Sequence, residues 1–339
     1  MSVQEEEIYI QGTDLARLNE LRYSTIKFYS EIGILPFKQA NKKLKKFYPT
    51  IAASNRIKEI QKLKKTLTIE QIKKYYKAKN ILNNKSMAKI ISIVLRKGGI
   101  GKTTTAINLA TALQLMGKKT LLIDLDPQSN ATISVGINPL ELTQSINTLF
   151  TNIDVTPREV IIETAFGLSI IPATEDLKKT EAGMTASQVG ALKPILNTLK
   201  DEFEYIIIDT PPSATYLSIN ALVASRYVLI PLQAHYLAMQ ALSQTMEDIK
   251  QVKNGLNSKL EIIGILPTMV NTNTNIARTV LENVKTSYPE LFLSMDIKYS
   301  VKHSEASLVG QPIVIYAPTS DGAQEYIKLA KYVDGERFA

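Results

Sequence analysis

The 339-residue sequence has no cysteine and no long apolar run. Without cysteine the chain forms no disulfide, no thiolate-bound metal site and no cysteine-held iron–sulfur cluster. No apolar run reaches the roughly 20 residues that a membrane-spanning helix needs. The acidic start, MSVQEEEIYI, does not resemble a signal peptide. The two histidines stand apart in the sequence, and we assign neither a catalytic role. We therefore expect a cytoplasmic protein, and its length indicates more than one domain.

Positive charge is concentrated in the first part of the chain. Residues 1–86 carry 18 Lys and Arg against 8 Asp and Glu, whereas the remaining residues carry 22 against 24. A basic excess confined to one part of a chain indicates that this part binds nucleic acid or another anionic surface. A basic face that only improves solubility is the alternative that charge alone leaves open.

The stretch RKGGIGKTTTAINLA, residues 96–110, has the pattern of a phosphate-binding loop. It follows a β-branched apolar run and opens a stretch with helical spacing, which is the strand–turn–helix context that such a loop requires. Its glycines allow backbone N–H groups to point into one concavity, and the N-terminus of the following helix adds partial positive charge. Lys102 would contact the outer phosphates, and the Thr103 hydroxyl would bind Mg²⁺. A glycine-rich turn beside a solvated lysine is the competing interpretation.

The loop departs from the pattern G-x-x-x-x-G-K-[ST] at one position, because Arg96 stands where the first glycine belongs. It reads K-G-G-x-G-K-T, with a second lysine at Lys97, and resembles the deviant P-loop of the ParA/MinD family of ATPases. The resemblance implies ATP and Mg²⁺ as cofactors and a sandwich homodimer, in which Lys97 reaches the partner's nucleotide. An exposed lysine beside the loop is the alternative for Lys97. Nucleotide contacts are implied for Gly98, Gly99, Ile100, Gly101, Lys102, Thr103 and Thr104.

From residue 89 onward, apolar strand-like runs alternate with helical stretches. The runs are apolar throughout, which is typical of parallel strands covered on both faces. We therefore predict an α/β fold of the P-loop NTPase type, a doubly wound, mostly parallel sheet that binds ligands beyond the carboxyl ends of its strands. The expected strands are residues 90–95, 120–125, 168–172, 205–210, 227–232 and 261–270, and the expected helices are 102–116, 216–225, 235–253 and 274–287.

Carboxylates stand at the ends of two expected strands. In DLDPQSN, the spacing of Asp124 and Asp126 places both on the same side of an extended chain. In IIIDTPPS, Asp209 ends an apolar strand before a stiff Pro–Pro turn. By the family resemblance, Asp126 orients the attacking water, Asp124 supports the Mg²⁺ shell, and Asp209 and Thr103 hold the Mg²⁺. A carboxylate that only caps a helix is the alternative for Asp209.

The N-terminal segment has the layout of a helix-turn-helix domain. The helical stretches DLARLNEL and TIKFYSEIG flank a tight turn, and the basic stretch KQANKKLKKFYP can form a two-stranded wing. Over residues 8–76 this order resembles the MerR-type winged helix-turn-helix domain. A helical adaptor that binds protein is the alternative. The resemblance places Ser24, Thr25, Lys27 and Tyr29 on or near the recognition helix, and Lys42, Lys43, Lys45 and Lys46 at phosphates from the wing.

The C-terminal region extends the resemblance to chromosome and plasmid ParA proteins. The stretches TMVNTNTN and SVKHSEASLVGQPIVIYAPTSDGAQEY follow the order found in those proteins. The resemblance implies that Asn271 lies near the adenine and that Lys298 and Lys302 bind DNA without sequence preference, although Tyr299 occupies another commonly basic position. The end of the sequence does not resemble the amphipathic membrane helix of MinD-type relatives, so we expect no membrane association.

These patterns predict a DNA partition ATPase with a MerR-like DNA-binding domain at residues 1–83, a linker at 84–88 and an ATPase domain at 89–339. ATP binding would close a dimer that binds DNA. Slow Mg²⁺-dependent hydrolysis, stimulated by a ParB-type centromere-binding partner, would release it, and the N-terminal domain would bind an operator or partition site. We expect association with the nucleoid. A transcriptional regulator switched by nucleotide occupancy and a MinD-like positioning ATPase are the alternatives.

Overall fold

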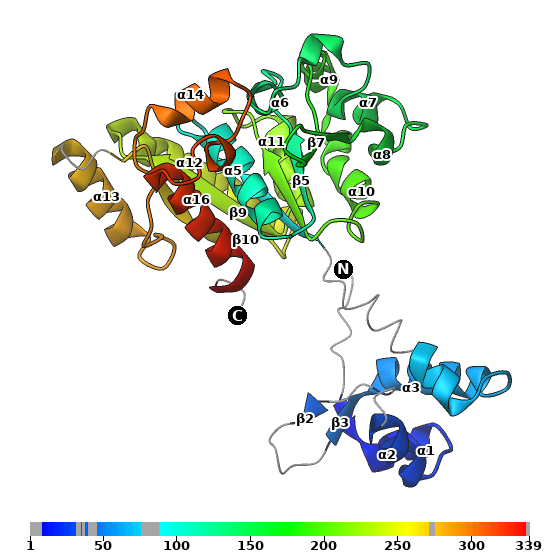
Figure 1. The fold of residues 1–339 in the computed structure, drawn as a ribbon. Helices are drawn as coiled ribbons and strands as arrows, with labels where there is room; N and C mark the ends of the chain where they lie inside the picture. The colour runs from blue at the N-terminus through cyan, green and yellow to red at the C-terminus, as the bar shows by residue number, and fades with distance from the viewer. Residues whose placement is uncertain are drawn as a thin grey trace. The chain divides into compact units, whose positions relative to one another are not determined.

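The chain divides into two compact units, residues 1–85 and 86–339 (Figure 1). None of the described helices is long and apolar enough to cross a lipid bilayer. Four residues with predicted roles, Asn271, Lys42, Lys43 and Lys45, lie outside the described part of the chain. The computed structural model describes residues 9–31, 35, 38–39, 46–75, 88–270 and 275–336.

The smaller unit combines several helices with a three-stranded antiparallel sheet. The sheet has the order β1-β3-β2, so β3 pairs with both of its neighbours. The β2–β3 pair is formed by the basic stretch in which the sequence predicts a wing. The labelled elements are β1 (Tyr9–Gln11), α1 (Gly12–Leu18), α2 (Tyr23–Glu31), β2 (Lys38–Gln39), β3 (Lys46–Pro49) and α3 (Thr50–Leu63), and residues 69–75 are also helical.

Helix α2 buries one side in the core of this unit and exposes the other. Ile26 and Tyr29 are buried against Leu15 of α1 and Ile57 of α3. Tyr29 lies on α2, as predicted, but its side chain is only 3% exposed in the core of this unit and is not placed to contact DNA. Among the other predicted DNA contacts of α2, Ser24 and Lys27 are exposed and Thr25 is half-buried.

The larger unit is built on a seven-stranded sheet in the order β10-β9-β4-β8-β5-β7-β6. All neighbouring strands are parallel except β6, which pairs antiparallel with β7 at one edge. The predicted doubly wound sheet is thus confirmed, and β6 is the strand that sequence patterning did not identify. The strands are β4 (Lys89–Ile93), β5 (Thr120–Asp124), β6 (Ile162–Glu163), β7 (Ser169–Ile171), β8 (Tyr205–Asp209), β9 (Tyr227–Gln233) and β10 (Glu261–Thr268).

Helices cover both faces of this sheet. Successive strand residues point to opposite faces, so Ile91 packs in the cluster beneath α5 and α16, whereas Ile90 packs in the cluster beneath α7, α10 and α11. Figure 1 shows α5 and α16 side by side. A third cluster joins β9 and β10 to α12 and α13. These helices are α5 (Lys102–Leu115), α7 (Ile146–Thr151), α10 (Leu192–Asn197), α11 (Tyr216–Ala224), α12 (Tyr236–Gly255), α13 (Asn275–Ser287) and α16 (Asp321–Lys331).

Further helical segments belong to the larger unit. They are α6 (Asn130–Ser134), η1 (Pro139–Glu141), α8 (Pro157–Val160), α9 (Leu177–Gly183), η2 (Ala186–Gln188), α14 (Lys302–Leu308), α15 (Ile313–Tyr316) and η3 (Tyr332–Glu336).

Strand register brings the carboxyl ends of the central strands to one level. Asp209, the last residue of β8, pairs with Ile93 at the end of β4 and with Asp124 at the end of β5. The loops that follow these three strands therefore begin side by side at one edge of the sheet. This is the edge at which open α/β sheets bind ligands.

Gly310 lies against the backbone of Gly136, at the junction of the loops that follow α14 and α6. A Cβ atom on Gly310 would lie 2.6 Å from Gly136 Cα, and its φ of 65° disfavours other residues. We expect Gly310→Ala to lower the free energy of unfolding by about 2 kcal/mol, measured by urea denaturation. In Gly183→Ala the new Cβ meets no atom within 4 Å, so stability should be unchanged or slightly higher. Equal losses in the two variants would contradict this account.

Candidate nucleotide-binding site

The chain between β4 and α5 forms a loop that exposes backbone N–H groups at the carboxyl end of the central strand. Gly99 and Gly101 have φ values of 71° and 85°, a conformation that side-chain-bearing residues rarely adopt. Gly101 directly precedes α5, and no side chain in the described residues caps this helix end. The first N–H groups of α5 are therefore available to an anion, which the partial positive charge of the helix N-terminus also attracts.

Three hydrogen bonds fix the shape of this loop. The Lys102 Nζ donates to the carbonyl oxygen of Lys97 at 2.7 Å, and the Thr268 hydroxyl donates to the carbonyl oxygen of Ile100 at 2.8 Å. The Thr105 N–H donates to the carbonyl oxygen of Gly101 at 2.8 Å. Because the Ile100 side chain is buried, its backbone is the part of this residue that can face a phosphate.

Lys102 lies between the loop and two carboxylates. Its side chain is largely buried. Burial lowers the pKa of Lys102, and the negative charges of Asp209 and Asp126 oppose that shift. An ammonium held in this position provides positive charge close to the N–H groups of the loop, which is the arrangement that a polyphosphate requires.

Asp124 is buried and fully engaged with groups of its own chain. Its carboxylate accepts hydrogen bonds from the Thr132 N–H at 2.8 Å, the Thr132 hydroxyl at 2.7 Å and the Asp126 N–H at 3.1 Å. Burial raises the pKa of Asp124 to about 6, although these hydrogen bonds favour the charged form. With these contacts, Asp124 is suited to support the residues of a metal site without binding the ion directly.

Asp209 differs from Asp124 because its carboxylate lacks partners. It is fully buried, and neither oxygen has a hydrogen-bond partner among the described residues. Burial and the neighbouring Asp124 raise the pKa of Asp209 to about 8, while the Lys102 charge and the Thr103 hydroxyl, which approaches the carboxylate without a hydrogen bond of normal geometry, act in the opposite direction. A buried carboxylate without a partner requires an explanation. A divalent cation held with the Thr103 hydroxyl fits the chemistry of these oxygen donors.

Asp126 and Lys97 differ in their exposure, since Asp126 is buried and Lys97 is not. Asp126 begins the loop that leads to α6, where its carboxylate accepts a hydrogen bond from the Gln128 N–H at 2.9 Å. Lys97 is half-exposed, and its Nζ lies 3.5 Å from Nδ1 of His235, in the turn before α12. The ammonium of Lys97 is thus held at the surface, while its carbonyl faces Lys102.

Comparisons with known proteins decide the family. The family model described as "AAA domain" matches residues 88–262. The chain is 41% identical over 250 residues to the sporulation initiation inhibitor protein Soj of Bacillus subtilis, covering 73% of this chain and 98% of Soj. The chain belongs to the ParA/Soj-type P-loop ATPases. It is also 39% identical over 249 residues to the chromosome partitioning protein ParA of Myxococcus xanthus, covering 73% and 88% of the two chains.

A solved structure with a similar fold supports the assignment of this chain to the ParA/Soj-type ATPases. The cobyrinic acid a,c-diamide synthase of Mycobacterium smegmatis, with bound ADP and magnesium, aligns with a TM-score of 0.64 and 33% identity. The alignment covers 73% of this chain and 94% of the synthase. The protein is accordingly an ATPase that uses ATP and Mg²⁺ as cofactors, and its relatives indicate a partition-type ATPase.

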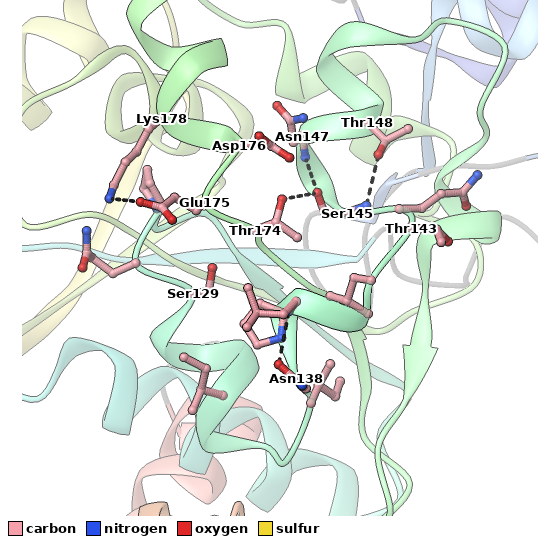
Figure 2. Close-up of a pocket in the computed structure, with 18 of the residues that line it drawn as sticks. Ser129, Asn138, Thr143, Ser145, Asn147, Thr148, Thr174, Glu175, Asp176 and Lys178 are labelled. Atoms are coloured by element: carbon pink, nitrogen blue, oxygen red, sulfur yellow. Dashed lines mark hydrogen bonds and ion pairs between the residues drawn. The ribbon is translucent and has the colours of Figure 1, made fainter.

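A large pocket lies beside this ParA/Soj-type site without including its glycine loop (Figure 2). Its volume is about 1170 Å³, and Ser129, just after Asp126, forms part of its wall. The polar contacts drawn in Figure 2 link pocket residues to one another. The Ser145 hydroxyl lies 3.2 Å from the Thr174 hydroxyl, and Lys178 Nζ lies 2.9 Å from Glu175. We assign this pocket no ligand.

Among the described residues, the structure brings together those that the sequence assigned to nucleotide and metal, and Asn271 lies outside the described part of the chain. The loop, Lys102, Thr103 and the three aspartates meet at one edge of the sheet. The candidate DNA contacts Lys298 and Lys302 are exposed just before and at the start of α14, and Lys46 begins β3. Tyr23 and Phe28, to which the sequence assigned no role, are 52% and 42% exposed on α2.

The raised pKa of Asp209 predicts how stability changes with pH in the protein without metal and nucleotide. Between pH 4 and pH 8 the folded state binds more protons at Asp209 than the unfolded state, whose carboxyl has its ordinary pKa of 3.8. The free energy of unfolding should therefore fall as pH rises through this interval. Asp209→Asn should flatten the fall, as measured by urea denaturation from pH 5 to pH 8.

Asp154→Asn is the matched control, because Asp154 is an exposed carboxylate. It should leave the pH dependence of stability as in the parent protein. An unaltered slope in Asp209→Asn would show that Asp209 is not the group that loses its proton across this range.

Proposed function

We propose that this protein is a DNA partition ATPase in which ATP closes a sandwich homodimer and the dimer binds DNA. The observation that carries the proposal is the K-G-G-x-G-K-T loop, in which Lys102 lies inside the site and Lys97 is half-exposed at its rim. A cation at the rim can serve the triphosphate of a second chain. The names of the relatives, which include chromosome partitioning proteins, support the same function.

Residues of one chain supply most of the hydrolytic site in this proposal. Lys102 and the loop N–H groups hold the β- and γ-phosphates, while Thr103 and Asp209 hold Mg²⁺, with Asp124 behind them. When bound, Mg²⁺ neutralises charge that develops on the phosphates. Asp126, at the exit of β5, orients the attacking water. The proposal gives Asp126 a role in turnover rather than in binding alone.

Lys97 makes hydrolysis depend on dimerisation. Catalysis of phosphoryl transfer consists mainly of positioning and of neutralising charge, so a cation delivered by the partner completes a site that one chain leaves unfinished. In the single chain the Lys97 ammonium lies beside His235. It would leave that position for the partner's phosphates when the dimer closes.

DNA binding is assigned to two surfaces in this proposal. In the smaller unit, the exposed side of α2 presents Ser24, Lys27 and Phe28 to a specific site such as an operator. In the larger unit, the exposed Lys298 and Lys302 add contacts to phosphates, which carry no sequence information. A ParB-type centromere-binding protein would stimulate hydrolysis and release the DNA, and the ATP-bound dimer would associate with the nucleoid.

A second candidate function is a transcriptional regulator that uses ATP as an occupancy switch. The helix-turn-helix layout and the β2–β3 pair of the smaller unit favour it. The two functions differ in turnover. Phosphate release that rises when DNA and the partner are both present supports the partition ATPase, whereas occupancy-dependent DNA binding without turnover supports the regulator.

We expect Lys97→Ala to bind ATP with an affinity within about threefold of the parent and to lose ATP-dependent dimerisation, because the substitution removes the cation intended for the partner's phosphates. Sedimentation velocity with ATP, with ADP and without nucleotide measures this. Lys331→Ala, an exposed lysine in the last turn of α16, should dimerise normally. Dimerisation of Lys97→Ala with ATP would refute the role of Lys97.

DNA footprinting with ATP, with ADP and without nucleotide tests the two DNA surfaces. Lys27→Glu should weaken binding at the specific site about tenfold, because α2 is placed as the recognition helix. Lys302→Glu should leave that footprint intact and reduce ATP-dependent binding to unrelated DNA, with a shallower dependence on salt. If the two variants behave alike on both kinds of DNA, the division of labour between the surfaces is wrong.

A further inference from the structure

Arg96 connects the start of the phosphate-binding loop to helix α12. Its guanidinium forms a two-pronged ion pair with Asp248, in which Nε donates to Oδ2 and Nη2 to Oδ1. The side chains are 33% and 21% exposed, so solvent screens this pair less than a surface pair. Two parallel hydrogen bonds between planar groups also fix the orientation of each partner.

The backbone of Arg96 is held by the same helix. Its N–H donates to the Thr245 hydroxyl at 3.1 Å, and that hydroxyl donates in turn to the carbonyl oxygen of Ala241 at 2.8 Å. Thr245 is buried, and it lies three residues from Asp248, on the same side of α12. Backbone and side chain of one loop residue are thus attached to adjacent positions of one helix.

This attachment acts on the residues that handle phosphate. Lys97 follows Arg96 directly, and its carbonyl oxygen accepts the hydrogen bond from Lys102 Nζ. Arg96 and Asp248 also line a small hollow with Pro211, in the turn after Asp209. The ion pair therefore lies where α12, the loop and the Asp209 turn come together.

We propose that Arg96 and Asp248 are a positioning pair, which holds the phosphate-binding loop in the conformation that binds ATP. Neither side chain is placed to contact the nucleotide in our assignment of the site, so both act through the loop. Helix α12 is a suitable anchor, because Leu242, Ile249 and Val252, next to Thr245 and Asp248 on this helix, are packed in the core. Without the anchor, the loop populates other conformations, and apparent affinity for ATP falls by the fraction of competent molecules.

The test compares Arg96→Ala, Asp248→Asn, Asp248→Ala, the double alanine variant and the exchanged pair Arg96→Asp/Asp248→Arg in steady-state ATPase assays of the full-length protein with Mg²⁺. Each single variant should raise KM for ATP about tenfold. The double alanine variant should be no worse than the single alanine variants, because both lose the same interaction. The exchanged pair should recover part of the loss.

Asp248→Asn keeps the size of the side chain and so separates positioning from folding. Its melting temperature without nucleotide should equal that of the parent. Arg226→Ala is the matched control, since it breaks another ion pair of the larger unit, with Glu261, and should leave KM unchanged. Parent-like KM values in the Arg96 and Asp248 variants, additive effects in the double variant, or an equal rise in Arg226→Ala would overturn the positioning role.

The effect on Lys97 rests on the proposed function and has its own measurement. If the position of the loop also determines whether Lys97 can contact the partner's phosphates, the Asp248 variants should need a higher protein concentration to dimerise at saturating ATP. A parent protein that does not dimerise with ATP would refute the dimer, and the KM comparison would still decide the role of the pair.

Discussion

The structure of the site depends on a buried carboxylate that the chain itself does not satisfy. Asp209 is fully buried, without a hydrogen-bond partner among the described residues, and lies opposite Asp124 in the strand register. Two neighbouring carboxylates in a buried environment are costly when both are charged. In our proposal a divalent cation would relieve that cost, whereas the raised pKa of Asp209 indicates that proton uptake relieves it without the cation. Ligand binding and local stability are therefore coupled through one side chain.

The surrounding groups lower this cost at Asp124 more than at Asp209. Thr132 and the backbone of Asp126 satisfy Asp124 with three hydrogen bonds. The negative charges of Asp209 and Asp126 partly balance the positive charge of Lys102 and oppose the lowering of its pKa. The parallel sheet makes this arrangement possible, because its register brings the ends of β4, β5 and β8 to one level. A small shift of one strand would separate the charges that depend on each other.

Much of this arrangement was predictable because it follows from local patterns. Once the strands are parallel, their carboxyl ends lie at one edge of the sheet. The loop after one apolar strand and the carboxylates at the ends of two others therefore share that edge. Strand β6 was not predictable, since a two-residue strand carries no periodicity. Tyr29 was assigned by resemblance, although its spacing from Ile26 places it in the core. The Arg96–Asp248 pair joins residues 152 positions apart, which no local pattern reveals.

The backbone of the loop explains why an arginine can stand where the strict pattern has glycine, and the Arg96–Asp248 pair shows where its side chain goes. Glycine is required only where φ is positive or the backbone approaches another group closely. In this loop, positive φ occurs at Gly99 and Gly101 and not at Arg96. The first position is therefore free to carry a side chain. That side chain points to α12 rather than into the phosphate cradle, so the substitution adds an anchor without occupying the site. The residue that departs from the pattern, Arg96, is thus also the residue that attaches the loop to α12.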